Sequence, residues 1–276
     1  MMMRLLVLTS YFLRRLLFSM AGSIYVILAI AYRAIFFPPS QGTPDIGNYF
    51  VIIGGFGAAI TFLATLTIAA RAYRAENYPL IVRLPSRVEY VTAVFGSSLL
   101  FAFMLQLLVA ILAMIRGPET SFGQMLEIPP VWIALNLLAA MLALHASDLV
   151  ASGWSRVLIF GVLAILLIGR NLAERLAAGM AALVSNISSF FYAQQWLAIA
   201  NGFGQMSSWL YGSGKEALEK LLGVIFWPFR TIIEAIFAGF FTPTQALAPA
   251  VIVLYATILF LVAADLFATK DLEMTE

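Results

Sequence analysis

Two uninterrupted apolar stretches constrain the fold of this chain most strongly. Residues 49–70 and 90–115 contain no charged side chain. A helix needs about 20 apolar residues to cross the hydrocarbon core of a bilayer, and both stretches meet that length. Hydrophobic residues make up 62% of the 276 residues and charged residues only 11%, whereas soluble domains carry about 25% charged residues. The sequence therefore predicts an all-α, polytopic membrane protein.

Four further stretches are apolar enough to be membrane spans. They are residues 16–32, 128–147, 157–169 and 246–264. The stretch 157–169 is the shortest, and it reaches the lower limit of span length only when it is extended to residues 154–170. We predict about six transmembrane helices in a single domain covering residues 1–276. Two additional spans, near residues 180–200 and 221–241, stay open as an alternative because a pair of spans leaves the C-terminus on the same side.

The arginines in the short connections predict the orientation of the chain. Three arginines precede the first span and four lie in residues 71–89, whereas residues 37–48 contain none. Cytoplasmic connections are enriched in Lys and Arg. We therefore expect both termini and residues 71–89 to be cytoplasmic, residues 37–48 and 171–245 to face outward, and the protein to lie in the plasma (inner) membrane.

Residues 1–15, "MMMRLLVLTSYFLRR", mix leucines and aromatic side chains with three arginines. This composition is typical of a helix that lies in the membrane interface, with its apolar side toward the lipid and its cations at the headgroups. We expect an interfacial helix here. The alternative is that these residues simply extend the first span toward the cytoplasm.

Residues 71–90, "RAYRAENYPLIVRLPSRVEY", form a charged segment between two apolar spans. Arg71, Arg74 and Glu76 have helical spacing, and the two prolines are expected to break or redirect that helix. Ser86 and Glu89 have the spacing of a capping box at the start of the third span. Tyrosine and leucine side chains outside the bilayer need a surface that buries them. Either they pack on the ends of their own bundle, or they dock onto a cytosolic protein.

Together, these features resemble the permease subunit of an ABC-2 type ABC transporter. The resemblance rests on the interfacial N-terminal helix, the six spans, the re-entry into the third span through "LPSRVEY", and the last span ending "FLVAADLFATKDLE". It covers most of residues 1–170 and 244–276. The resemblance implies a separate cytosolic ABC ATPase subunit, a second permease in a homodimer or heterodimer, and contact with membrane lipids. The transported substrate would be hydrophobic or amphipathic.

The resemblance also implies a role for the segment between spans two and three. In the family, this segment is a coupling helix that seats in a groove of the ATPase, and the matching positions here are residues 71–84. The ATPase-binding candidates are Arg71, Tyr73, Arg74, Glu76, Tyr78, Leu80 and Arg83. Residues 171–245 depart from the family pattern, which has only short re-entrant helices there. Residues 176–214 carry no charge but are rich in Ser, Asn and Gln, which suits helices lying in the outer interface or dipping into it.

The chain carries no nucleotide-binding motif of its own. The stretch "GSGKE" at residues 212–216 is similar to a phosphate-binding loop, but Trp209 stands where the first glycine is required and Glu216 replaces Ser or Thr. With one histidine and no cysteine, the sequence lacks the ligands for bis-histidine haem or a zinc-protease site. We predict no enzymatic activity without a partner, no cofactor and no metal. The net charge of +2, without a basic block, argues against nucleic acid as a partner.

Polar side chains inside the predicted spans are candidate functional groups. His145 and Asp148 are three residues apart and are expected on one helical face. They could form a structural pair, serve translocation or proton transfer, or ligate a pigment or metal. Gln106 and Asn136 are expected to form hydrogen bonds between helices, and the small residues around Gly57 favour close helix packing.

Two functional hypotheses from different classes remain. The first is a transport protein, in which this chain is the permease half that works with a partner ATPase. The second is a non-transporting structural subunit of a large membrane complex, energy-converting or photosynthetic, in which His145 could ligate a pigment. A co-purifying ATPase would favour the first hypothesis, and bound chromophore would favour the second.

Overall fold

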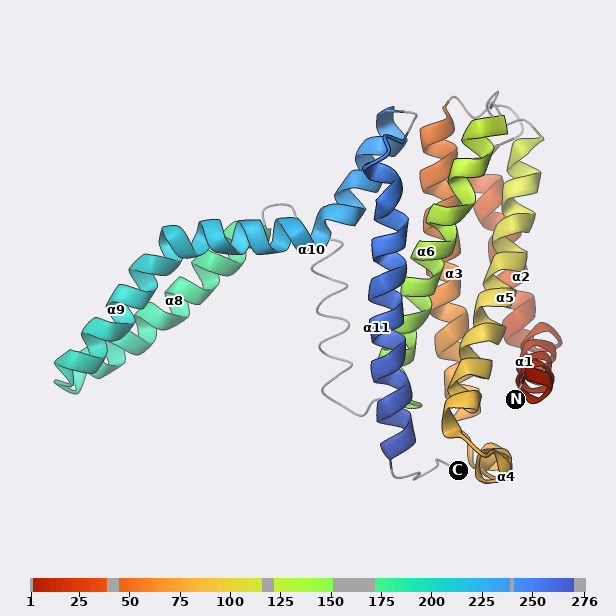
Figure 1. The fold of residues 1–276 in the computed structure, drawn as a ribbon, viewed down its shortest axis with the longest axis horizontal. Coiled ribbons are helices and arrows are strands. Elements are labelled where there is room, and N and C mark those ends of the chain that lie inside the picture. Colours follow the sequence, from red (N-terminus) through yellow and green to blue (C-terminus); the bar gives the residue numbers. More distant parts are fainter. Residues whose placement is uncertain (1, 39–44, 116–121, 151–171, 239–240, 271–276) are drawn as a thin grey trace. The chain divides into compact units, whose positions relative to one another are not determined.

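The computed structural model describes residues 2–38, 45–115, 122–150, 172–238 and 241–270, and these residues form helices and turns with no strand. The chain divides into two compact units, Met1–Phe160 with Thr231–Glu276, and Gly161–Arg230. Figure 1 labels the helices. The fold class is therefore all-α, as the sequence predicts.

The first unit is a bundle of long helices. The helices that lie side by side in it are α2 (Met20–Phe36), α3 (Ile46–Ala72), α5 (Arg87–Met114), α6 (Phe122–Ala146) and α11 (Ala248–Thr269) (Figure 1). Helix α3 packs against both α5 and α6, and α11 packs against α6. Two short 3-10 helices are η1 (Ala75–Asn77) and η2 (Gln245–Leu247). Helices α1 (Met2–Leu17) and α4 (Tyr78–Arg83) lie together at one end of this bundle (Figure 1).

Six helices of the described chain are long and apolar enough to cross a membrane. They are Ile46–Ala72, Arg87–Met114, Ile128–Ala146, Glu174–Ala193, Ser213–Ala238 and Gln245–Thr269. The predicted spans 49–70, 90–115, 128–147 and 246–264 are thus confirmed as long apolar helices. The predicted first span qualifies only as part of the bent pair α1 and α2. The predicted span 157–169 lies outside the described residues. Two of the six, in residues 174–238, correspond to the additional spans that the sequence left open.

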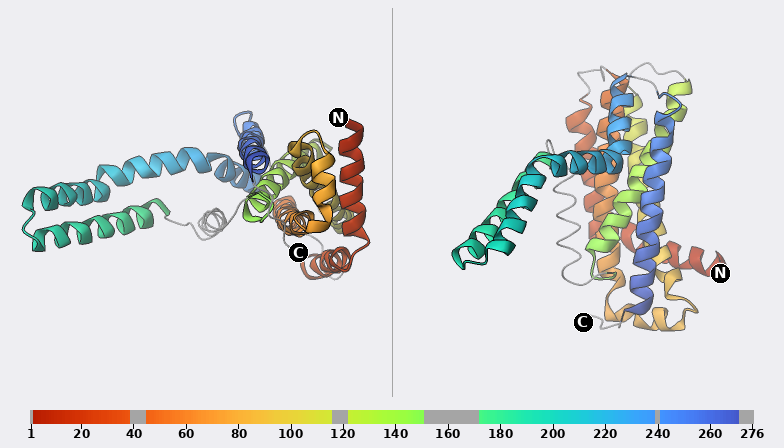
Figure 2. Two further views of the ribbon diagram at one scale, coloured as in Figure 1. Left: turned by 90° about the horizontal axis from the view of Figure 1, so that it is seen from below. Right: turned by 60° about the vertical axis from the view of Figure 1, so that its left-hand side comes forward.

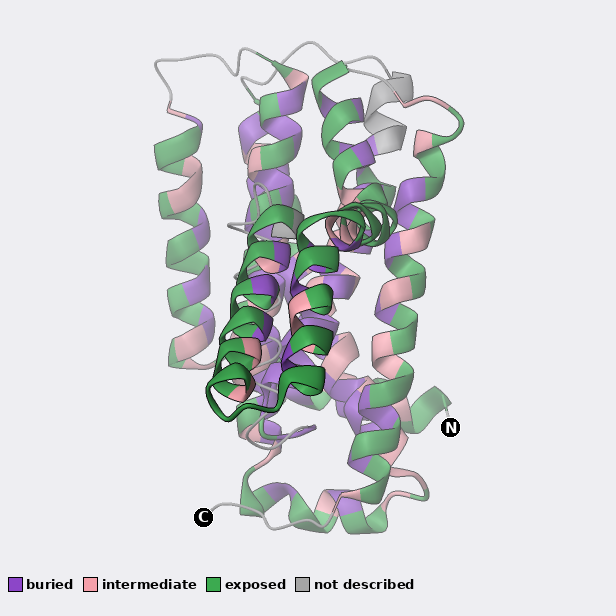
Figure 3. Cartoon of the chain, turned by 90° about the vertical axis from the view of Figure 1, so that its left-hand side faces the viewer, coloured by how far each residue is buried: buried purple, intermediate pink, exposed green. Residues whose placement is uncertain are grey.

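Large apolar side chains cover the outside of the bundle, and its inside combines small residues with large ones such as Phe101 and Met141. Helix α5 buries Ala93 and Ala102, whereas Leu107 and Ile111 on the same helix are exposed. Figure 3 shows the buried residues turned toward neighbouring helices and the exposed residues turned outward. Membrane helices pack in this way because lipid solvates large apolar groups and small residues let the backbones approach closely. The burial pattern thus agrees with a multi-pass membrane protein.

Helix α1 is a separate helix and does not extend α2. The two axes are bent by 70°. Ser19 caps α2, because its side chain accepts a hydrogen bond from the Gly22 backbone nitrogen at 3.2 Å. A Cβ atom on Gly22 would lie 2.2 Å from the Leu16 carbonyl oxygen, so only glycine permits this close turn. The two helices are therefore not one straight helix, although by length and composition together they can form a single broken span.

The second unit contains a helical hairpin. It is formed by α8 (Leu172–Ala193) and α9 (Leu197–Tyr211), which run side by side (Figure 2), and is followed by α10 (Ser213–Ala238). Ala181, Val184 and Leu210 form its small core, with Phe203 packed against it. Two hydroxyls bind the facing helix: Ser207 donates to the Ala181 carbonyl at 3.0 Å, and Ser188 donates to the Ala200 carbonyl at 2.7 Å.

Candidate functional site

The connection between α3 and α5, residues 73–86, is built from two short helices. Helix α3 ends at Ala72, and the backbone of Arg74 is extended before η1 and α4 begin. The expectation of a helix running through Arg71, Arg74 and Glu76 and broken by Pro79 is therefore wrong. Pro79 lies in the first turn of α4, where a proline is tolerated because its missing N–H would have no partner in the helix.

Side chains from elsewhere in the chain complete the end of α3. The Tyr90 hydroxyl donates to the Ala72 carbonyl at 2.7 Å, and the Asn77 side-chain amide donates to the Arg71 carbonyl at 2.8 Å. The last carbonyls of a helix lack partners within the helix. These two bonds satisfy two of them, and they hold the connection against the end of α3.

The N-terminal helix α1 contacts the connection through Arg15. Its guanidinium forms an ion pair with Glu76 and donates to the Tyr11 hydroxyl at 3.0 Å, and its backbone carbonyl accepts a hydrogen bond from Arg71 at 3.2 Å. The hydrogen bond with Glu76 is the main reason why the pKa of Arg15 is raised above its ordinary value. Both side chains of the ion pair are partly exposed, so we expect the pair to orient α1 more than to stabilise it.

The end of α11 contacts the connection from the other side. The Lys270 ammonium lies 4.7 Å from the centroid of the Tyr73 ring, within the range of a cation–π contact. The same ammonium donates to the Asp148 carbonyl, and Arg87 donates to the Lys270 carbonyl at 2.8 Å. The connection is thus held between the first and last described helices.

The predicted ATPase-binding residues divide into two groups. Arg71, Tyr73 and Glu76 make the internal contacts described above, whereas Arg74, Tyr78 and Arg83 are exposed and Leu80 is half-buried. Sequence reasoning missed three residues of the segment. Asn77 and Ile81 are buried, and Val82 is 61% exposed. The helical period could have shown that Val82 is exposed and Ile81 is not, because Val82 lies one turn after Tyr78 and shares its face of α4.

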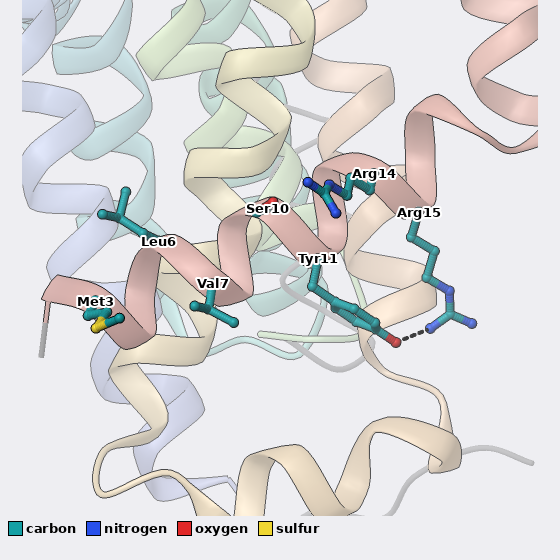
Figure 4. A pocket seen from close by; sticks show the side chains of 7 residues that line it. All are labelled: Met3, Leu6, Val7, Ser10, Tyr11, Arg14 and Arg15. Atoms are coloured by element: carbon teal, nitrogen blue, oxygen red, sulfur yellow. Dashed lines mark hydrogen bonds between the residues drawn. The ribbon is translucent and has the colours of Figure 1, made fainter.

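An open hollow lies along α1 beside this segment. Its volume is about 700 Å³, and its lining comprises Met3, Leu6, Val7, Ser10, Tyr11, Arg14 and Arg15 (Figure 4). A second hollow of about 350 Å³ is lined by residues of α1 and by Leu84 at the end of α4. The lining is mostly apolar with arginines at one end. This surface of α1 is not covered by the described bundle, and Met3 and Val7 are largely exposed.

The predicted polar residues of spans three and four do meet inside the bundle. The Asn136 amide donates to Gln106 Oε1 at 2.6 Å, and the Gln106 amide donates to the Ile53 carbonyl of α3 at 3.2 Å. The expected interhelical hydrogen bonds are therefore confirmed. Asn136 Oδ1 is buried and has no hydrogen-bond partner within the described chain. Gly57 makes room for the group, because a Cβ atom there would lie 2.2 Å from the Gln106 side chain.

His145 and Asp148 do not share a helical face. Helix α6 ends at Ala146, so Asp148 lies in the turn that follows the helix. His145 is buried, with Nδ1 2.9 Å from the Met141 carbonyl oxygen, and Asp148 is exposed. The prediction of a common face was wrong because it assumed that α6 continues past Ala146.

The "GSGKE" stretch comprises the cap of α9 and the first turn of α10. Gly212 ends α9, and α10 begins at Ser213. Lys215 forms an ion pair with Glu174 at 3.3 Å. In a phosphate-binding loop, the glycine-rich turn follows a strand and its lysine reaches a phosphate. Here the stretch follows a helix and not a strand, and Lys215 binds a carboxylate of the protein itself. Among the described residues, His, Asp and Glu side chains form no group of three that could hold a metal ion.

Comparison with known proteins identifies no relative of this chain. No family model, no curated protein and no solved structure matches the chain. The candidate site therefore rests on its geometry: a short helical connection at one end of an apolar bundle, held by α1 and by the end of α11, with Tyr78 and Val82 facing outward.

Proposed function

We propose that the chain is the membrane-spanning permease subunit of an ABC-2 type ABC transporter and moves a hydrophobic or amphipathic substrate with a separate ATPase subunit. The observation that carries this proposal is the connection between α3 and α5. Its Tyr78 and Val82 side chains are exposed, whereas its Asn77 and Ile81 side chains are buried against the rest of the protein. A docking element of this kind can pass a movement of its partner to the helices that flank it.

The internal contacts of the connection support a mechanical role. Asn77 binds the end of α3, Tyr90 at the start of α5 binds the Ala72 carbonyl, and Glu76 pairs with α1. A displacement of the connection would therefore move α1, α3 and α5 together. Closely packed helices transmit a displacement because a packed protein interior is hardly compressible. In this proposal, ATPase closure shifts these helices and changes access to a path for substrate.

Energy for transport comes from the partner in this proposal. The stretch that is similar to a phosphate-binding loop, residues 212–216, forms the cap of α9 and the first turn of α10, and its lysine pairs with Glu174. The ATPase is expected to meet the exposed arginines Arg74 and Arg83 with carboxylates, and Tyr78 and Val82 with an apolar groove. Interfaces of this kind depend on a few aromatic and arginine side chains.

The proposal also fixes an orientation. Residues 71–89 and both termini are cytoplasmic, in the plasma (inner) membrane, because the arginines concentrate on that side. Helix α1 lies in the cytoplasmic interface: its apolar residues Met3 and Leu6 are exposed, and its 70° bend from α2 turns it away from the direction of a span. A second permease completes the transporter as a homodimer or heterodimer.

Co-purification tests the proposed function. Replacing both Tyr78 and Val82 by alanine should weaken ATPase binding by on the order of 2 kcal/mol, roughly thirty-fold. The matched control is Ile111→Ala, which removes an apolar side chain that is also exposed but lies on α5, away from the connection. We expect the control to retain the ATPase. Equal recovery with all variants, or bound chromophore and no ATPase with the wild-type protein, would favour a non-transporting structural subunit.

A further inference from the structure

The α8–α9 hairpin exposes many large apolar side chains, and most of them follow one pattern. On both helices, the residue just before most residues of the helix–helix contact is large and apolar, whereas Phe203 of the contact is preceded by Gly202. On α8 these residues are Met180, Leu183, Ile187 and Phe190, which precede the contact residues 181, 184, 188 and 191. On α9 they are Ile199, Met206 and Trp209, which precede the buried residues 200, 207 and 210.

Tyr192 and Tyr211 follow the contact at the two ends of the hairpin, and elsewhere the residues just after the contact residues are small or polar. They are Ala182, Ser185 and Ser189 on α8, and Asn201, Gln205 and Ser208 on α9, and all are exposed. In two antiparallel helices, positions that precede the contact lie on one side of the pair, and positions that follow it lie on the other. The hairpin therefore has one apolar face and one polar face, each built from both helices.

Neither face carries a charge. No Asp, Glu, Lys or Arg occurs in residues 176–214. The charged side chains begin only at the open end of the hairpin, where Lys215 pairs with Glu174. A binding site for a charged protein surface or a nucleic acid would need complementary charges. An uncharged polar face opposite an apolar face instead suits a boundary between water and hydrocarbon.

Several polar groups of the hairpin form hydrogen bonds within it. Ser188 and Ser207 bind carbonyls of the facing helix. At the turn, the backbone nitrogens of Gln194, Gln195 and Trp196 donate to carbonyls of α8 at 3.0–3.2 Å. Buried or lipid-covered backbone groups cost several kcal/mol when they lack partners. The turn can therefore approach an apolar medium without leaving these donors unpaired.

Aromatic side chains mark both ends of the hairpin. Trp196 stacks on Phe191 at the turn, with ring centroids 5.7 Å apart, and Trp209 and Tyr211 are exposed near the open end. Trp and Tyr concentrate at the depth of lipid headgroups, where their rings are apolar and their polar atoms stay hydrated. Aromatic residues at both ends fit a hairpin that lies at headgroup depth, and they fit equally a hairpin that crosses between the two interfaces, so the decision rests on the two faces.

We propose that the α8–α9 hairpin lies flat in the surface of the lipid bilayer, with its apolar face against the acyl chains of one leaflet and its Ser, Asn and Gln face toward the headgroups and water. Length and composition alone would also allow Glu174–Ala193 to cross the membrane. The two-sided pattern argues against crossing, because a span would place Ser185 and Asn201 among acyl chains. This lipid contact does not depend on the proposed transport function.

Fluorescence quenching in nanodiscs tests the proposal, since single cysteines can be placed in this cysteine-free chain. A fluorophore is attached at Leu183→Cys or Met206→Cys on the apolar face, and at Ser185→Cys or Ser208→Cys on the polar face. We expect lipids brominated on the acyl chains near the headgroup to quench the first pair, and aqueous iodide to quench the second. Leu254 on α11 is also exposed. A label at Leu254→Cys shows how strongly brominated lipids quench a fluorophore that lies on a membrane span.

The other outcomes each contradict the proposal in a recognisable way. If all four labels are quenched best by bromines near the acyl-chain ends, the hairpin crosses the membrane. Protection of the Leu183 and Met206 labels from both quenchers would mean that protein, either the bundle or a second copy, covers the apolar face. Quenching of all four by iodide would place the hairpin in water. The measurement needs no ATPase, so its failure is separate from failure of the transport proposal.

Discussion

Gly57 shows how a single residue sets the packing of the bundle. Its missing side chain leaves the space that the Gln106 amide fills between α3 and α6. Gly57→Ala should displace Gln106 and weaken its bonds to Ile53 and Asn136, lowering the free energy of unfolding by about 1–3 kcal/mol. The thermal unfolding midpoint of the purified protein in detergent, followed by tryptophan fluorescence, measures this loss.

Gly55, two residues away on α3, provides the matched control. A Cβ atom there meets nothing within 4 Å, so Gly55→Ala should leave stability unchanged or raise it by up to about 1 kcal/mol through helix propensity. Equal losses for the two variants would show that helix flexibility, and not the space for Gln106, determines the effect.

The Gln106–Asn136 contact permits a double-mutant cycle at the same site. Both side chains are buried, and their amide groups are 2.6 Å apart. We expect a coupling energy of about 0.6–2 kcal/mol, because hydrogen bonds between membrane helices are worth only that much when the unfolded chain finds other partners. Additive losses in Gln106→Leu, Asn136→Leu and the double variant would mean that the contact contributes nothing beyond packing.

At the scale of single residues, sequence reasoning succeeded where the chemistry is local to two spans. An amide inside an apolar helix needs a partner, so interhelical hydrogen bonds of Gln106 and Asn136 were predictable, whereas the structure supplies the finding that they bind each other. Asn77 was missed because its burial depends on contacts with α1 and α3 that the sequence does not show. The prediction that His145 and Asp148 share a helical face was wrong, because no glycine or proline marks the end of α6 at Ala146.

The connection between α3 and α5 is the element on which the proposed function depends, and Asn77 holds it in place. Asn77→Ala removes the donor to the Arg71 carbonyl and should cost about 1–3 kcal/mol of local stability. The connection would then open more often, and trypsin should cut after Arg74 or Arg83 roughly five times faster or more. Mass spectrometry of timed digests in detergent locates and quantifies the cuts.

Val82→Ala is the control for this element, because Val82 is exposed on the same short helix. Its cleavage rate should match that of the wild-type protein. A connection that is already open in the wild-type protein would be cut equally fast in all three, and the mechanical role that we propose would lose its basis.

At the scale of helices, apolar runs predicted α3, α5 and α11 well, because a membrane span requires a long stretch without charge. The ends of helices were less predictable. Helix α3 ends at Ala72, where Tyr90 and Asn77 bind its last carbonyls. Neither residue could be recognised from the sequence as a partner of this helix end. Ser86 was correctly predicted as the cap of α5, since its side chain accepts from the Val88 nitrogen at 3.3 Å. Glu89 Oε2, in contrast, is buried with no hydrogen-bond partner in the described chain, so that oxygen does not complete the predicted capping box.

For the whole molecule, the structure puts the connection and the ends of α6 and α11 at one end of the bundle, since Lys270 contacts both Tyr73 and Asp148. Alternating spans then place the start of α3 at the opposite end. We predict that a cysteine at Ala75 is labelled only after the cytoplasm is opened, and that a cysteine at Asp45 is labelled from outside intact cells by an impermeant maleimide. Both residues are exposed, so access depends on the side of the membrane. Labelling of Ala75→Cys from outside would reverse the proposed orientation.

The central claim is that this chain works as the permease of an ATP-driven transporter, and ATP hydrolysis by the purified complex tests it most directly. The protein is isolated from its native membrane, placed in nanodiscs, and assayed for vanadate-sensitive ATPase activity, with the double variant Tyr78→Ala and Val82→Ala beside it. We expect hydrolysis in the wild-type sample and a loss of roughly thirty-fold or more in the variant at limiting ATPase concentration. A folded wild-type protein without associated hydrolysis, or a variant that hydrolyses ATP as well as the wild-type protein, would contradict the account.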